Sequence, residues 1–220
     1  MQRLAACVDA PAAGLGGRLI SGVREAGKRA TRRRVLDAAR ELFDEVGYES
    51  ATIRQIAGRA GVSVGSVFTG FYSKQHILSE VMQERLAALY GDLERVIPHL
   101  RGSTADRCRS MFAVHYAFEF RRLHLFLAYV AAGFDWRADP ALPTMGANPR
   151  LRGMIRDCLA GGIERGDVRP DADVELAVDL LVAAYAWNYR RAAAQPTQPE
   201  TLTDLFDRQV GLIFAGLARA

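Results

Sequence analysis

The segment TIRQIAGRAGVSVGSVFTGFYSK, residues Thr52–Lys74, decides the fold of this 220-residue chain. Its first part reads as a short amphipathic helix, because Thr52 can cap the N-terminus and Gln55, three residues later, can reach back to complete a capping box. Apolar residues then recur at helical spacing, at Ile53, Ile56, Ala57 and Ala60. This part therefore predicts a short helix with one buried face.

The second part, Gly61–Lys74, is rich in residues that form helices poorly. It holds three glycines and three valines, and a glycine costs about 1 kcal/mol relative to alanine inside a helix. We expect Gly61 to make a sharp turn and Ser63 to cap a short helix from Val64 to about Phe71. Two short helices joined by such a turn form either a plain structural corner or a helix-turn-helix, whose second helix enters the major groove of DNA. Small outward-facing residues favour the second interpretation, since they allow close approach to base edges.

The flanking sequence is helical as well. Apolar residues recur at helical spacing from Val35 to Val46, and Gly47 suits a left-handed C-cap. Ser73 can cap a helix that runs toward Ile97 and ends at Pro98. Five more helices are expected between breaks that contain Pro and Gly: Ser103–Glu119, Phe120–Phe134, Asn148–Arg165, Asp173–Ala193 and Glu200–Leu217. The chain is therefore expected to be all-α, with about nine helices.

The positive charge of the chain is confined to its N-terminal part. The formal net charge is +4, and residues 1–80 hold 12 Lys and Arg against 8 Asp and Glu, whereas residues 81–220 hold 17 of each. Six cations and one acid lie between Arg24 and Arg34. Such a cluster is either a solvated charge run or a contact surface for a polyanion such as DNA. We expect residues 1–30 to form a flexible basic arm.

Residues 31–82, TRRRVLDAARELFDEVGYESATIRQIAGRAGVSVGSVFTGFYSKQHILSEVM, resemble the DNA-binding domain of the TetR family of bacterial transcriptional repressors. The resemblance covers about 50 positions and becomes one of architecture only beyond Met82. It implies an N-terminal three-helix helix-turn-helix domain at 31–82 and a C-terminal helical domain at 83–220 that binds a small molecule and forms a homodimer. The expected partner is double-stranded DNA with a pseudo-palindromic operator, which a repressor of this kind leaves when its effector binds.

The resemblance also assigns DNA contacts, and Lys74 stands at the position of the family's phosphate-contacting lysine. The full set of expected DNA-binding residues is Arg32, Arg33, Thr52, Arg54, Ser63, Val64, Gly65, Ser66, Phe68, Thr69 and Lys74. Two positions depart from the family pattern. Phe68 replaces a tyrosine and so lacks a hydroxyl for phosphate, and Gly70 replaces a histidine or tyrosine.

Aromatic and apolar residues after Met111 predict an effector site that is mostly apolar. The candidate ligand-binding residues are Met111, His115, Tyr116, Glu119, Tyr129, Trp136 and Tyr185. The same residues would form an ordinary core in any helical domain. His115 and Glu119, four residues apart, could bind a metal, act as acid and base, line a polar spot in the cavity or lie at the surface, and no third ligand is visible nearby.

Other signals are weak. Three cysteines at wide spacing predict neither a disulfide framework nor a zinc site, and Cys108, beside two arginines, is either a structural thiol or a redox sensor. No apolar run is long enough for a membrane span, and we expect a cytoplasmic protein without a cofactor. No catalytic constellation is visible, so we expect a regulator rather than an enzyme. The alternatives are a small-molecule-binding helical protein and a DNA-binding regulator that needs no ligand.

Overall fold

The computed structural model of this chain describes residues 15–135, 142, 144–195 and 197–217, with side chains described from Val23 onward. The described residues form nine α-helices and a short 3₁₀ helix, and none of them lies in a strand. The helices are α1 (Leu15–Val46), α2 (Ile53–Ala60), α3 (Val64–Gly70), α4 (Lys74–Val96), η1 (Ile97–His99), α5 (Thr104–Phe120), α6 (Leu123–Gly133), α7 (Pro149–Arg165), α8 (Val174–Ala194) and α9 (Pro199–Ala215). The all-α expectation is confirmed.

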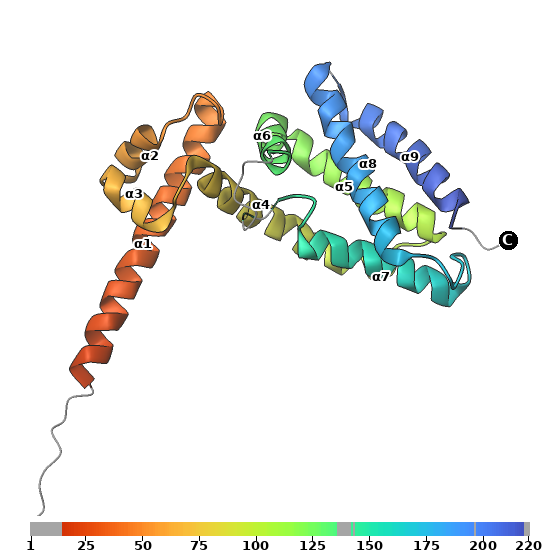
Figure 1. Cartoon of the computed structure of the whole chain (residues 1–220), viewed down its shortest axis with the longest axis horizontal. Helices are drawn as coiled ribbons and strands as arrows, with labels where there is room; N and C mark the ends of the chain where they lie inside the picture. Colours follow the sequence, from red (N-terminus) through yellow and green to blue (C-terminus); the bar gives the residue numbers. More distant parts are fainter. Residues whose placement is uncertain (1–14, 136–141, 143, 196, 218–220) are drawn as a thin grey trace, which may run out of the picture.

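The helices divide into two groups joined by α4. Helices α1, α2 and α3 lie together at one end of the molecule, α5 to α9 form a bundle at the other end, and α4 runs between the two (Figure 1). The side chains of α4 are buried along its length, from Ile77 and Leu78 in the first group to Leu89 and Leu93 in the second. Because one helix belongs to both cores, a displacement of α4 in the bundle must also move the first group.

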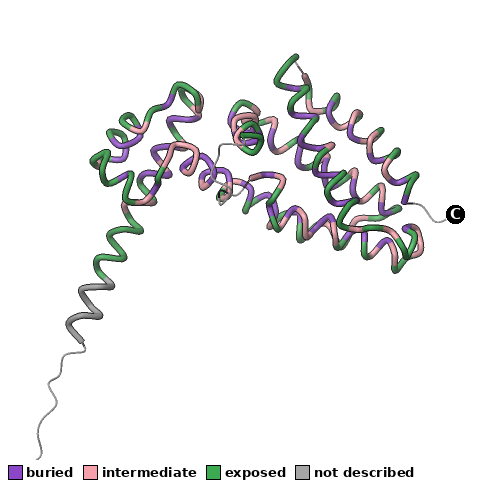
Figure 2. The backbone as a smooth tube through the Cα atoms, in the orientation of Figure 1, coloured by how far each residue is buried: buried purple, intermediate pink, exposed green. Residues whose placement is uncertain are grey.

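The start of α1 differs from the sequence expectation. We expected a flexible arm as far as residue 30, but Leu15–Ala30 are helical and continuous with the rest of α1. No proline interrupts this stretch, but it holds four glycines, which form helices poorly, so continuity with the rest of α1 accounts for the helix better than composition does. Residues 23–30 are exposed and project beyond α2 and α3 (Figure 2). The basic cluster is therefore carried on a helical extension, while residues 1–14 lie outside the described part of the chain.

Caps fix the geometry of the first group as expected. Thr52 and Gln55 form the capping box at the start of α2, and Gly61 ends that helix with φ at 63°, in the left-handed region that favours glycine. The Ser63 side chain accepts a hydrogen bond from Ser66 N at the start of α3. Each N-cap of this kind stabilises a helix by about 1 kcal/mol. These local interactions offset the poor helix propensity of the glycines and valines in α3.

The first group has its own apolar core. Val67 is the one buried residue that α3 contributes, and it lies among buried side chains of α1 and α2. Val62, expected to turn inward, is half-buried and packs on the same core. The α1 and α2 side of this core comprises Val35, Ala39, Leu42, Phe43, Ile56 and Ala57. With a single inward residue, α3 presents most of its surface to solvent.

The bundle is also capped where expected. Ser103 and Asp106 form a second capping box at the start of α5, and the Asn148 and Asp173 side chains cap α7 and α8. All five helices begin and end within three residues of the bounds expected from the sequence. The core of this part receives side chains from α4 to α9 and includes five fully buried tyrosines and several phenylalanines. These tyrosines bring phenolic hydroxyl groups into an otherwise apolar interior, and several of them belong to the candidate effector site.

Candidate nucleic-acid interface and internal polar cluster

Helix α3 exposes the face expected to contact DNA. Val64 and Phe68 keep 39% and 51% of their surface accessible, and Gly65, Ser66 and Thr69 are also exposed. The Thr69 hydroxyl donates to the carbonyl oxygen of Gly65 at 3.1 Å, which leaves its methyl group and its oxygen lone pairs outward. The exposed face is thus small, largely apolar and uncharged, a surface that suits contact with base edges and thymine methyl groups.

Helix α2 supplies one free cation beside α3. Arg54 is exposed and forms no hydrogen bond or ion pair within residues 23–217 as far as these are described. The Thr52 hydroxyl, in contrast, already donates to Gln55 Oε1 at 2.8 Å. Arg54 therefore remains available for a phosphate or a guanine, whereas Thr52 stabilises the helix that carries it.

Lys74 is engaged within the protein. Its ammonium group lies 2.8 Å from the carbonyl oxygen of Tyr48, 3.2 Å from that of Glu49 and 3.0 Å from that of Ala51. It also lies 4.3 Å from the centre of the Tyr48 ring. An ammonium group has three hydrogens to donate, and these three carbonyls accept all of them. Lys74 thus holds the turn between α1 and α2 against α4, and the phosphate contact expected for it stays a prediction.

Arg32 is likewise engaged within the protein. Its guanidinium donates to the carbonyl oxygen of Gly70 at 2.7 Å, pairs with Glu80 at 3.0 Å and lies 4.2 Å above the Phe71 ring. A Cβ atom at Gly70 would lie 3.8 Å from this guanidinium. Arg32 thus occupies the space beside Gly70 and ties the end of α3 to α1 and α4. Only part of its guanidinium remains for the expected DNA contact.

A groove separates the extension of α1 from α3. It has a volume of about 490 Å³, and its walls include Lys28, Arg29 and Arg32 of α1 and Ser66 and Thr69 of α3. The α1 wall carries three cations and one acid, Glu25, and the α3 wall carries hydroxyl groups, so the groove has a net positive wall that is suited to a sugar–phosphate strand. Arg33, also expected to contact DNA, is exposed and lies 3.7 Å from Asp37.

The candidate effector residues meet inside the bundle. Met111, His115, Tyr116 and Glu119 lie on the buried side of α5. Tyr129 of α6 and Tyr185 of α8 are buried as well. The side chains of His115 and Tyr185 are joined at 3.3 Å, and Tyr185 reaches Tyr189 at 3.2 Å. Trp136, the seventh candidate, lies outside the described residues.

Burial changes the pKa values of His115 and Glu119 strongly. The loss of solvation lowers the pKa of His115 to about 3, so the imidazole is neutral near pH 7. The same cause raises the pKa of Glu119 to about 7, although the charge of Arg85 opposes it. Glu119 therefore changes charge near neutral pH. Its charge also contributes to raising the pKa of Tyr90, Tyr129, Tyr185 and Tyr189, which places the carboxyl group close to all four phenols.

Three buried polar atoms of this cluster lack a hydrogen-bond partner within the described part of the chain. They are Tyr90 Oη on α4, and His115 Nε2 and Glu119 Oε1 on α5. The rings of Tyr90 and His115 lie 5.5 Å apart. An unpaired polar atom in the interior costs about 1–3 kcal/mol, so such atoms indicate a place for a polar group of a bound molecule or for a water.

Glu119 is also connected to α4. The Arg85 side chain on α4 lies 3.4 Å from Glu119 Oε2 and donates to the carbonyl oxygen of Phe118 at 3.0 Å. An ion pair between Arg122, just before α6, and Asp44 of α1 joins the same region to the first group of helices. The polar cluster is therefore linked through named contacts to the helices that carry the DNA-facing surface.

A second exposed surface is apolar and belongs to the last two long helices. Trp187 and Leu212 keep 56% and 78% of their surface accessible, and Leu176 and Leu180 on α8 are also exposed. Between them lies a hollow of about 550 Å³ lined almost wholly by apolar side chains. Large exposed apolar patches of this kind are typical of protein interfaces. This surface agrees with the expectation that the C-terminal domain forms a homodimer.

Several of these contacts had no signal in the sequence. Arg85 and Glu119 are 34 residues apart, and Arg32 and Gly70 are 38 apart, so no local spacing relates them.

Cys108 and Cys158 also meet, with 3.7 Å between their sulfur atoms. The Cys158 sulfur and burial raise the pKa of Cys108 by more than the charge of Arg109 lowers it. Arg109 itself pairs with Asp106.

No helix among the described residues is long and apolar enough to cross a membrane. In the same residues, no three His, Cys, Asp or Glu side chains are grouped as a metal site would require. His115 and Glu119 accordingly gain no third ligand in the part of the chain that is described.

Comparisons with known proteins agree with the geometry. Residues 35–81, from within α1 to within α4, match the family described as bacterial regulatory proteins, tetR family. The HTH-type transcriptional regulator HbdR of Aromatoleum sp. (strain CIB) is 30% identical over 160 residues, which cover 71% of this chain and 68% of that protein. The HTH-type transcriptional repressor KstR2 of Rhodococcus jostii (strain RHA1) is 26% identical over 203 residues, covering 87% of this chain and 93% of KstR2.

The similarity extends to whole solved structures. The structure of Thermus thermophilus FadR, a TetR-family transcriptional repressor in complex with lauroyl-CoA, aligns with a TM-score of 0.74 at 27% identity. The alignment covers 86% of this chain and 96% of FadR. Both groups of helices are therefore included in the likeness.

Proposed function

This chain belongs to the TetR family of bacterial regulatory proteins and is a ligand-responsive, DNA-binding transcriptional regulator, and we propose that it is a repressor which an apolar effector releases from a pseudo-palindromic operator. The observation that carries the proposal is the exposed face of α3 on a helix-turn-helix fixed by caps at both of its helices. The protein acts without a catalytic step, in the cytoplasm, where the DNA is.

Helix α3 recognises the base sequence of the operator DNA. Val64, Gly65, Ser66, Phe68 and Thr69 face the major groove, where Val64 and Thr69 contact thymine methyl groups. Arg54 contributes a phosphate or guanine contact from α2, and Ser63 and Arg33 lie nearest the phosphates. This division follows from accessibility and charge, because the apolar α3 face is suited to bases and the flanking cations to the backbone.

Dimerisation places two such surfaces on one DNA duplex. The exposed apolar faces of α8 and α9 pair with the same faces of a second copy, which gives a two-fold symmetric protein. A two-fold dimer of helix-turn-helix domains requires two half-sites separated by about one helical turn of DNA or a multiple of it.

The effector binds in the bundle, among the aromatic side chains around Glu119. Met111, Tyr116, Tyr129 and Tyr185 supply its apolar walls, and the three unpaired polar atoms of Tyr90, His115 and Glu119 receive a polar group. Lauroyl-CoA is the first probe, because a repressor 27% identical to this chain is known in complex with it. The effector acts by favouring an arrangement in which α4, held to Glu119 by Arg85, is displaced.

A displacement of α4 changes the separation of the two α3 helices in the dimer and so weakens operator binding. An effector can do this only to the extent that it binds one arrangement more tightly than the other. A preference of about 3 kcal/mol would lower operator affinity about 150-fold.

The test is a mobility-shift titration of the purified protein on the DNA upstream of its own gene, with and without lauroyl-CoA. Saturable binding that resists competitor DNA and is relieved by the acyl-CoA supports the proposal. Specific binding that neither lauroyl-CoA nor any other bound ligand affects would indicate a regulator that needs no ligand. Absence of specific binding to any DNA in a genomic selection would leave a small-molecule-binding helical protein.

A further inference from the structure

Two cysteines that are 50 residues apart in sequence meet inside the bundle. Cys108 on α5 donates a hydrogen bond to the sulfur of Cys158 on α7, with 3.7 Å between the two sulfur atoms. Cys108 is fully buried, whereas Cys158 keeps 8% of its surface accessible. Both are free thiols in this structure. A disulfide requires an S–S distance of about 2.05 Å, so the two sulfur atoms must move closer together before a bond can form.

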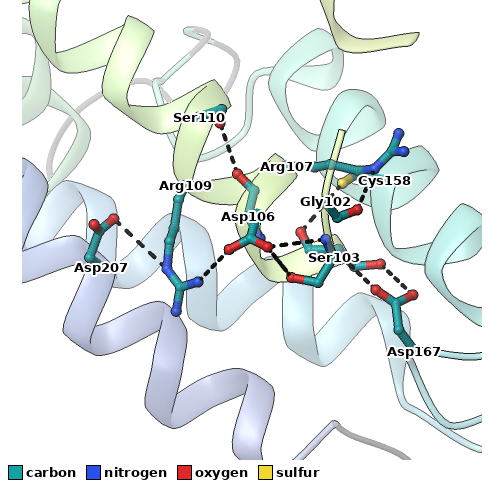
Figure 3. A network of polar contacts seen from close by, with 10 residues as sticks. Gly102, Ser103, Asp106, Arg107, Arg109, Ser110, Cys158, Asp167 and Asp207 are labelled. Atoms are coloured by element: carbon teal, nitrogen blue, oxygen red, sulfur yellow. Dashed lines mark hydrogen bonds and ion pairs between the residues drawn. The ribbon is translucent and has the colours of Figure 1, made fainter. Parts of the chain in front are cut away.

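The groups around Cys158 lower its pKa, although burial and the charge of Asp167 oppose the shift. The Cys158 thiol also donates a weak hydrogen bond to the carbonyl oxygen of Thr104, the first residue of α5, with 3.9 Å between sulfur and oxygen. Arg107 lies beside it at this end of α5 (Figure 3). The hydrogen bond from Cys108 and the charges of Arg165 and Arg107 lower the pKa of Cys158. The thiolate is the nucleophilic form of cysteine.

Cys108 is set apart from its neighbour by burial. Its interaction with Cys158 and its lack of solvent raise its pKa well above the usual value. Of the two thiols, Cys158 is therefore the more acidic and Cys108 the less acidic. A more acidic thiol with some access to solvent, beside a buried thiol, is the arrangement of an attacking and a resolving cysteine.

We propose that Cys108 and Cys158 form a dithiol that hydrogen peroxide oxidises to an internal disulfide linking α5 to α7. In the first step the Cys158 thiolate attacks one oxygen of the peroxide, the O–O bond breaks, and the departing hydroxide takes up a proton to become water. In the second step the Cys108 sulfur attacks the sulfenic acid on Cys158, the S–O bond breaks, and the hydroxide leaves as water with the Cys108 proton. Two thiols lose two electrons, and one peroxide becomes two waters.

The disulfide would act on the bundle that holds the polar cluster. Helix α5 carries both His115 and Glu119, and α7 packs beside it. A bond between the two helices closes a loop of about 50 residues, which restricts the unfolded chain and raises the midpoint of thermal unfolding. It also limits how far α5 and α7 can separate.

The experiment uses the full chain with Cys7→Ser, so that Cys108 and Cys158 are the only thiols. After treatment of the folded protein with hydrogen peroxide, the intact mass should fall by about 2 Da and the denatured protein should show no titratable thiol. Peptide mapping should place the bond between Cys108 and Cys158 within one chain. The thermal midpoint should rise by about 5 °C or more.

Two controls separate this site from general oxidation. The same protein unfolded in urea should form the disulfide at least about ten-fold more slowly, because it lacks the arrangement that activates Cys158. In a Cys108→Ser variant, peroxide should leave a sulfenic acid on Cys158 that dimedone traps, and Cys158→Ser should give no adduct on Cys108. The proposal fails if the folded protein loses no mass, forms bonds only between chains or reacts no faster than the unfolded one. Each of these outcomes is independent of DNA and effector binding.

Discussion

Arg85 on α4 and Glu119 on α5 form an ion pair at 3.4 Å in which one carboxylate oxygen contacts the arginine and the other is buried without a hydrogen-bond partner among the described residues. This contact joins the candidate effector site to the helix that the DNA-binding domain shares with the bundle. It also fixes a carboxyl group whose pKa is raised to about 7, mainly because it is buried.

Glu119 should make the stability of the protein depend on pH. Since its folded-state pKa, about 7, is above the ordinary 4.5, the folded state binds the proton more tightly than the unfolded state. The resulting stability is complete below pH 4.5 and is lost as the pH rises to about 7, a change of about 3 kcal/mol. Glu119→Gln removes this dependence. The free energy of unfolding of the variant, relative to that of the parent, should therefore rise by about 3 kcal/mol between pH 4.5 and pH 8.

Urea unfolding of parent and variant at both pH values measures the effect. Glu164→Gln, which changes an exposed carboxyl group on α7, serves as the control and should show no such gain. If the free energies of unfolding of the parent and Glu119→Gln differ by the same amount at pH 4.5 and at pH 8, the raised pKa of Glu119 is contradicted.

Lys74 should matter for stability and not for phosphate binding. In Lys74→Met the carbonyls of Tyr48, Glu49 and Ala51 lose their shared donor, so the free energy of unfolding should fall by about 2 kcal/mol. The slope of log affinity against log salt should stay unchanged. Arg54→Gln is the matched contrast, because this exposed cation has no described partner; its stability should stay within about 0.5 kcal/mol of the parent, while the salt slope falls by about 0.9.

Urea unfolding and salt titrations of DNA binding on both variants decide the matter. A salt slope reduced by Lys74→Met with stability retained would restore the role that the family resemblance assigned to this lysine.

The fold was predictable because its signals are local. The capping box of Thr52 and Gln55, the left-handed Gly61 and the cap at Ser63 each depend on residues within a few positions of one another, and all three are confirmed. The roles of single side chains were less predictable. Lys74 reaches carbonyls 23 to 26 residues away, and its position in the chain cannot reveal that these acceptors consume its hydrogens.

The N-terminal extension of α1 was not predicted to be helical. The run of cations from Arg24 to Arg34 led to the expectation of a flexible arm, and the four glycines of residues 15–30 also disfavour a helix. Continuity with α1 outweighs both effects here, because a helix that is already nucleated extends at little cost.

The extension of α1 should bind DNA without reading its sequence. In Lys28→Gln with Arg29→Gln, the groove beside α3 loses two cations but keeps strong helix formers. Affinity for the operator and for random duplex DNA should fall by similar factors, and the salt slope should decrease by about 1.8. Deletion of residues 1–30 should have the same effect in larger measure, whereas Thr69→Ala should change the preferred sequence.

Fluorescence anisotropy over a range of salt concentrations, on operator and random DNA, measures these changes. Unaltered affinity and slope after the deletion would mean that the extension makes no contact with DNA and that other residues replace the hydroxyl that Phe68 lacks.

The apolar face of α8 and α9 should hold the dimer together. Leu212 is 78% exposed and lies beside the hollow lined by Leu180 and Trp187. Leu212→Glu would bury a charge in the interface, at a cost of several kcal/mol on each side of the two-fold axis. Light scattering should then report a monomer at micromolar concentration, where the parent is a dimer. The operator affinity should fall at least about 100-fold, because each half-site must be bound independently.

Val96→Glu, which places the same charge on an exposed apolar position at the end of α4, should leave the dimer intact. If Leu212→Glu remains a dimer while Val96→Glu dissociates, the interface lies near α4 and the assignment of α8 and α9 is wrong.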